Sequence, residues 1–117
     1  MRLPWAGVRD SAGAATVAHC TNLGTLSRTV FIDLYEFDGT LACSLSFAVG
    51  VNETRTFASR DTSVYTEDDI CDAAPNIDQG YLKIYLSSAT TLMCTVQVID
   101  PAAATPAFAT TLDLFRF

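Results

Sequence analysis

Residues 28–49, RTVFIDLYEFDGTLACSLSFAV, decide the fold because two alternating apolar runs flank one Asp-Gly pair. Asp38-Gly39 favours a two-residue hairpin turn, since this turn type needs positive φ at both central residues. The turn sets the strand register by placing Phe37 opposite Thr40. In that register one face is uniformly apolar, which identifies it as the core side. This face carries Val30, Ile32 and Leu34 opposite Phe47, Leu45 and Cys43.

The other face of this hairpin carries an aromatic row, Phe31, Tyr35 and Phe37, with Asp33 inside it. The facing strand offers only small side chains, at Ala42, Ser44 and Ser46. An apolar patch of this kind invites association when it is left open. Three groups could cover this patch: the ends of the chain itself (residues 3–5, Phe115 and Phe117), another subunit, or a sugar ring stacked on the aromatics.

Further strand signals follow one another at short spacing, without a helical period between them. The expected strands are 15–21, 28–37, 40–49, 53–59, 81–86, 91–100 and 108–117, with a short piece at 64–65. Seven to eight short strands without helices predict an all-β, antiparallel β-sandwich. At 117 residues the chain has the size of one domain. We expect residues 1–13 to form an N-terminal arm and residues 14–117 to form the sandwich.

A second hairpin is predicted between strands 81–86 and 91–100. A three-residue loop, 88–90, gives one uniformly apolar face, which the two-residue alternative does not. That face pairs Leu82, Ile84 and Leu86 with Val96, Cys94 and Leu92. The outer face then carries Tyr81, Lys83, Tyr85, Met93, Thr95 and Gln97, so Tyr81 and Tyr85 form a second aromatic patch.

The four cysteines contain no Cys-x-x-Cys pair, and the chain has one histidine, which is poor material for a zinc site. Two structural disulfides are the better interpretation, and they indicate an exported protein at the cell surface or outside the cell. The preferred pairing is Cys20–Cys94 with Cys43–Cys71, while Cys43–Cys94 stays open as an alternative. Residues 1–13 lack the continuous apolar core of a secretory signal, so a cytoplasmic location is not excluded.

The charge of the chain argues against two classes of partner. The net charge is −6, and no cluster of Lys and Arg occurs that could neutralise phosphates. Nucleic acids and anionic membrane surfaces are therefore disfavoured. No apolar run approaches the roughly 20 residues that span a bilayer, so membrane insertion is not expected.

Neither catalysis nor metal binding has a strong signal. His19 lies beside Cys20, but neighbouring strand residues point to opposite faces and cannot act as a base–nucleophile pair. We therefore expect no enzyme and no cofactor. A weak calcium candidate is the acidic loop that carries Glu67, Asp68, Asp69 and Asp72. Its spacing matches no calcium loop, and a solvated acidic loop is the ordinary explanation.

The layout of motifs resembles a group of known proteins. His19-Cys20-Thr21-Asn22 precedes a strand, Phe37-Asp38-Gly39-Thr40 precedes another, and an acidic loop leads on to Met93-Cys94-Thr95. This order is similar to that of small bacterial immunoglobulin-like sandwich proteins and, in outline, to the sensory rhodopsin transducer family. The resemblance implies an immunoglobulin-like sandwich and carries over no functional residue. An antibody-type domain would place a tryptophan between its core cysteines, whereas Trp5 lies outside them.

The functional expectation is a non-enzymatic structural or adhesive module that self-associates or binds another protein. Its contact residues would be the aromatics Phe31, Tyr35, Phe37, Tyr81 and Tyr85, which bring apolar area at low entropic cost. The alternative is a carbohydrate-binding module, in which the same rings stack on sugars and Asp33 or Gln97 bonds their hydroxyls.

Overall fold

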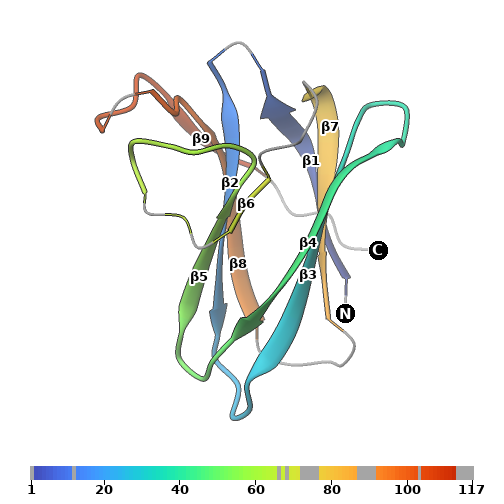
Figure 1. Ribbon diagram of the computed structural model, residues 1–117, viewed down its shortest axis with the longest axis vertical. Coiled ribbons are helices and arrows are strands. Elements are labelled where there is room, and N and C mark those ends of the chain that lie inside the picture. The colour runs from blue at the N-terminus through green and yellow to red at the C-terminus, as the bar shows by residue number, and fades with distance from the viewer. Residues whose placement is uncertain are drawn as a thin grey trace.

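The protein is a two-layer β-sandwich (Figure 1). The computed structural model describes residues 2–11, 13–65, 67, 69–71, 77–86, 92–102 and 104–112. These residues form nine strands: β1 Arg2–Asp10, β2 Ala15–Asn22, β3 Arg28–Tyr35, β4 Leu41–Val49, β5 Thr54–Ala58, β6 Asp69–Ile70, β7 Ile77–Tyr85, β8 Leu92–Ile99 and β9 Ala109–Thr111. Across these residues, no helix is long and apolar enough to cross a membrane.

One sheet has four strands in the order β1-β7-β3-β4, and the other has five in the order β6-β5-β2-β8-β9. All neighbours are antiparallel except β5 and β6, which run parallel. The predicted all-β sandwich is thus confirmed. Side chains of alternate strand residues fill the space between the sheets, as the period of two requires. The largest fully buried side chains include Phe57, Ile32, Leu34, Ile77, Leu82 and Ile84.

The register predicted for the first hairpin is confirmed along most of its length. Every pair from Arg28↔Val49 to Leu34↔Cys43 is the one expected. The apolar alternation fixes this register because a slip of one residue would turn the whole core face toward water.

The turn of this hairpin differs from the prediction. The Gly39 N–H donates to the Glu36 carbonyl (3.0 Å), and the Glu36 N–H donates to the Thr40 carbonyl (2.9 Å). The loop is therefore the three residues Phe37 to Gly39, with positive φ at Gly39 (86°) and not at Asp38. A turn closed by one left-handed glycine adds a residue, so the expected Phe37–Thr40 pair is wrong.

The extra turn residue shifts the register locally. Tyr35 pairs with Leu41 and not with Ala42 as expected. The shift ends at Leu34, where the apolar face enters the core.

The predicted second hairpin is wrong, because its two strands belong to different sheets. β7 pairs with β1 and β3, whereas β8 pairs with β2 and β9. Leu82, Ile84 and Val96 are nevertheless buried as expected. Alternation determines which face of a strand is buried, but it does not determine which strand lies beside it. The six residues predicted on one outer face consequently divide between two sheets.

The expected N-terminal arm is also corrected, since residues Arg2–Asp10 form the edge strand β1 of the four-stranded sheet. Trp5 and Val8 on this strand are buried in the core. Trp5 therefore faces inward and does not cover the outer aromatic row. Phe115 and Phe117, the other expected cover, lie outside the described residues, and the strand expected at 108–117 is described as β9 alone.

The structure has the preferred disulfide pairing, Cys20–Cys94 and Cys43–Cys71. Cys20 and Cys94 lie directly opposite each other on β2 and β8. Cys43 on the edge strand β4 joins Cys71, which follows the edge strand β6, so this bond links the two sheets. Two disulfides indicate an oxidising environment.

Candidate functional site

The candidate site is the outer face of the four-stranded sheet, where strand pairing gathers the predicted aromatics. β3 and β7 are neighbours, and their register places Phe31 opposite Tyr85 and Tyr35 opposite Tyr81. We call these four side chains the aromatic face. Sequence reasoning assigned them to two patches because it paired β7 with β8, and the structure joins them into one.

The four rings form two parallel pairs. The Phe31 and Tyr85 ring centroids lie 5.2 Å apart with an interplanar angle of 14°. Those of Tyr35 and Tyr81 lie 4.6 Å apart at 11°. Such cross-strand pairs hold each other in place and add about 0.5–1.5 kcal/mol beyond the area that they bury. The ring pairs therefore hold the aromatic face in one arrangement.

A charged pair separates the two ring pairs. Asp33 on β3 lies opposite Lys83 on β7. The Lys83 Nζ lies over two rings, 5.3 Å from the Tyr35 centroid and 5.5 Å from the Tyr85 centroid. Cation–π attraction of this kind contributes about 0.5–1 kcal/mol at exposed sites. Sequence reasoning placed Lys83 on an outer face but missed this role; its spacing of two residues from Tyr85 was a usable signal, whereas the contact with Tyr35 depends on the pairing of β3 with β7.

Asp33 is buried and holds neighbouring hydroxyls. Its Oδ1 accepts from the Ser44 hydroxyl (2.6 Å), and its Oδ2 accepts from the Tyr35 hydroxyl (3.3 Å). Desolvation and the nearby negative charge of Asp33 raise the pKa of Tyr85 above its usual value. Because its lone pairs serve these internal bonds, Asp33 acts here as a positioning residue of the face.

The exposed rim of the site lies toward the hairpin turn. Tyr81 is 38% exposed, and Leu41, which pairs with Tyr35, is 52% exposed. Phe37 lies in the turn loop and is 79% exposed, so it stands apart from the four rings. The predicted site thus gathers Phe31, Asp33, Tyr35, Tyr81 and Tyr85, and it excludes Phe37.

The arrangement of the rings leaves little open ring surface on which a sugar could stack. Tyr35 and Tyr85 each have a ring neighbour and the Lys83 ammonium over them, which leaves less open ring face. Gln97, the other expected hydroxyl partner, lies on β8 in the opposite sheet and accepts a hydrogen bond from Tyr65 (3.1 Å). Asp33 and Gln97 therefore cannot serve one ligand.

The acidic loop forms no metal cluster among the residues that the structure describes. The Glu67 carboxylate accepts a hydrogen bond from Thr62, and Asp69 lies 3.5 Å from the Arg55 guanidinium. Asp68 and Asp72, the other two calcium candidates, lie outside the described residues.

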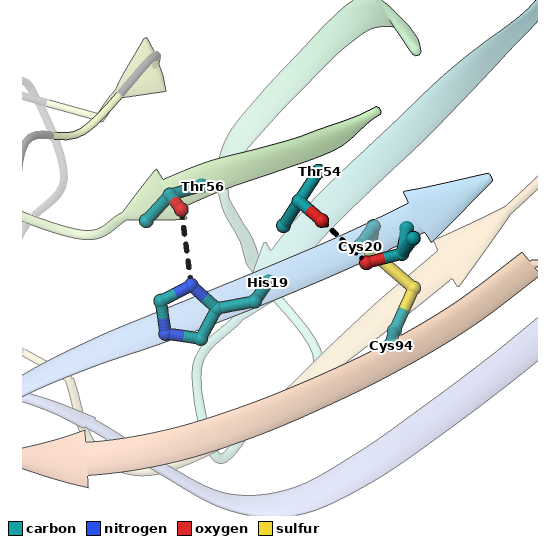
Figure 2. Close-up of a disulfide and its surroundings, with 6 residues drawn as sticks. His19, Cys20, Thr54, Thr56 and Cys94 are labelled. Atoms are coloured by element: carbon teal, nitrogen blue, oxygen red, sulfur yellow. Dashed lines mark hydrogen bonds between the residues drawn. A yellow bond between two sulfur atoms is a disulfide. The ribbon is translucent and has the colours of Figure 1, made fainter. Parts of the chain in front are cut away.

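His19 lies on β2 of the five-stranded sheet, with its ring beside Thr56 of β5 and next to the Cys20–Cys94 disulfide (Figure 2). Its Nδ1 lies 3.0 Å from the Thr56 hydroxyl, and its ring meets the Tyr65 ring edge-on at 4.5 Å. Burial lowers the pKa of His19 below its usual value. The adjacent Cys20 is buried and bonded to Cys94, so it supplies no nucleophile.

Comparison with known proteins adds little. No family model matches the chain, and no curated protein matches it. The chain is similar to part of one solved structure, described as "Structure of PfGH50B", at 11% identity and a TM-score of 0.43. The match covers 92% of this chain and 16% of that chain, so this protein spans about a sixth of the length of the larger one.

Proposed function

We propose that this protein is a non-enzymatic structural module that associates through its aromatic face, as part of an extracellular or surface assembly. The observation that carries the proposal is the joining of four aromatic side chains and one lysine on the outer face of a single sheet. Rigid aromatic side chains supply contact area at a small cost in entropy.

The two outer faces of the sandwich differ in a way that supports the proposal. On the five-stranded sheet, Val64 and Tyr65 from a loop pack against a small apolar cluster. The rings of the aromatic face belong to neither buried cluster of the described residues. A contiguous apolar patch of this kind on a protein surface is usually an interaction site and seldom stays open to solvent.

The test compares two exposed apolar residues on opposite faces. Tyr81→Ser removes a ring from the aromatic face, while Met93→Ser removes an apolar side chain that is more exposed, from the five-stranded sheet. Size-exclusion chromatography with light scattering should show that Tyr81→Ser weakens association about tenfold and that Met93→Ser does not. Circular dichroism checks that both variants are folded.

Two results would count against the proposal: a wild-type protein that stays monomeric, or equal behaviour of the two variants. A glycan array separates the alternative of carbohydrate binding. Binding of a glycan that Tyr81→Ser abolishes would replace assembly by sugar recognition.

A further inference from the structure

The four sheet edges differ in their protection against a further strand. β6 has two residues and β9 has three, which makes both poor templates. β1 has two register shifts against β7 and contains Pro4, Arg2, Arg9 and Asp10. β4 is a nine-residue edge, LACSLSFAV, without a charge or a proline. Long, uncharged edges are the ones that pair with other chains.

The backbone of β4 offers alternate residues to this free side. The Glu36 N–H donates to the Thr40 carbonyl across the hairpin (2.9 Å), so alternate β3 residues from Leu34 back to Arg28 point toward β4. Their partners Cys43, Leu45, Phe47 and Val49 therefore point toward β3. Antiparallel strands alternate between residues that point to the neighbour and residues that point away. The N–H and C=O groups of Ser44, Ser46 and Ala48 therefore point outward.

The side chains at these three positions leave the edge accessible. Ser44, Ser46 and Ala48 are all exposed and small. On β4 itself, a strand approaching the edge meets only these small side chains beside the backbone groups that it would bond. Natural edge strands often carry lysine at such positions to prevent this approach, and β4 carries none.

We propose that β4 is a dimerisation edge, at which two copies of this chain pair antiparallel and extend the four-stranded sheet into one of eight strands. The regular part of β4 runs from Cys43 to Val49, and its midpoint is Ser46. A two-fold axis there pairs Ser46 with Ser46 of the second copy and Ser44 with Ala48. On the inner face it pairs Leu45 with Phe47, an apolar match.

A second copy fits this edge better than a charged partner does. The chain carries a net charge of −6, so the repulsion between two copies is smallest where the surface that they share carries no charge of its own. β4 is such a surface, and its antiparallel self-pairing places no like charges opposite each other. The pairing would also place the aromatic faces of both copies on the same side of the extended sheet, because a two-fold axis normal to the sheet preserves its faces.

The experiment uses charge at the midpoint of the edge. Ser46→Lys and Ser46→Glu each place like charges directly opposite across the two-fold axis, and each should weaken dimerisation about fivefold or more. An equimolar mixture of the two variants should restore a heterodimer, since the opposed charges then attract. Thr110→Lys, on the other sheet, is the matched control and should leave the dimer unchanged. Sedimentation velocity from about 10 μM to 1 mM covers the affinity expected of one strand pair.

Hydrogen exchange separates this proposal from association through the aromatic face. The amides of Ser44, Ser46 and Ala48 should gain protection as the protein concentration rises, and Tyr81→Ser should not remove this gain. A wild-type monomer at about 1 mM would overturn the edge pairing. So would Ser46→Lys that dimerises as tightly as wild type, or a Lys–Glu mixture that fails to associate. Association that survives Ser46→Lys but not Tyr81→Ser would support the aromatic face alone.

Discussion

Gly80 on β7 lies against the backbone of Tyr35 on β3, and its replacement by alanine tests the packing that unites the aromatic face. A Cβ at this position would overlap the Tyr35 carbonyl oxygen and would lie 2.5 Å from the Ile77 Cγ2. The carbonyl is a backbone atom of the neighbouring strand, so it cannot rotate away. Gly80→Ala must therefore push β7 away from β3, directly beside the Tyr35–Tyr81 ring pair.

Overpacking against an atom that cannot move should cost about 2–3 kcal/mol of unfolding free energy, the upper part of the usual range. Reduced freedom of the unfolded chain offsets about 0.4–1 kcal/mol of this cost, which leaves a net loss of about 1–2.5 kcal/mol. At a urea m-value of about 1.5 kcal/mol per molar, the unfolding midpoint should fall by about 0.7–1.7 M. Fluorescence of Trp5 reports this transition, because it is the single tryptophan and is buried on β1, the other neighbour of β7.

Gly50→Ala is the matched control. Its Cβ would meet only the Glu53 side chain, at 3.4 Å, and its φ is not positive. We expect its free energy of unfolding to stay within about 0.5 kcal/mol of wild type. Equal midpoints for Gly80→Ala and Gly50→Ala would refute the close approach of β3 and β7, and with it the single aromatic face.

Two further predictions concern the disulfides and His19. The double variant Cys43→Ala/Cys71→Ala, which opens a loop of 28 residues, should lose about 3.5 kcal/mol of stability, and Cys20→Ala/Cys94→Ala, with a separation of 74, about 4.5 kcal/mol. Thermal melts without reductant check this order, and the reverse order would contradict the loop-entropy account. Because burial lowers the pKa of His19, the unfolded chain takes up a proton first as the pH falls through about 6.5, so stability should drop between pH 7.5 and 5.5. His19→Gln should reduce this pH dependence of the unfolding free energy, measured by urea titrations at several pH values. An unchanged pH dependence would assign it to other titratable groups.

The sequence predicted the class of the fold and the inner faces of its strands, because both depend on local alternation. Val30, Ile32 and Leu34 are buried on β3 as expected, and so are Leu82 and Ile84 on β7. Alternation is a property of a strand by itself, so it survives a wrong choice of partner.

The loop length of the β3–β4 hairpin could not be predicted from the local sequence. Asp38-Gly39 marks a tight turn, but the pair is compatible with a two-residue loop and with a three-residue loop closed by glycine. The apolar pattern tolerates either loop, since a local bulge beside Leu34 absorbs the extra residue. Turn type was therefore not determined by the residues that determine the register.

The N-terminal strand was missed for a different reason. Pro4, Arg9 and Asp10 interrupt the apolar character of residues 1–13, which reads as an irregular arm. Proline and charges are, however, compatible with an edge strand, which has one free side. Trp5 and Val8 supply the inward face, and the register shift between Ala6 and Val8 accommodates the spacing of three residues between them.

The candidate site depends on which strand pairs with β7, and the sequence pattern did not determine that partner. Consecutive strands pair more often than not, so the hairpin with β8 was the natural expectation. Placing β7 beside β3 instead gives Phe31 and Tyr35 ring partners and sets Lys83 over two of the rings. Cross-strand aromatic pairs of this kind stabilise one pairing over another by about 1 kcal/mol each. The residues of the aromatic face therefore help to select the arrangement that brings them together, and this is why a weakened β3–β7 contact should disturb the fold and the face at once.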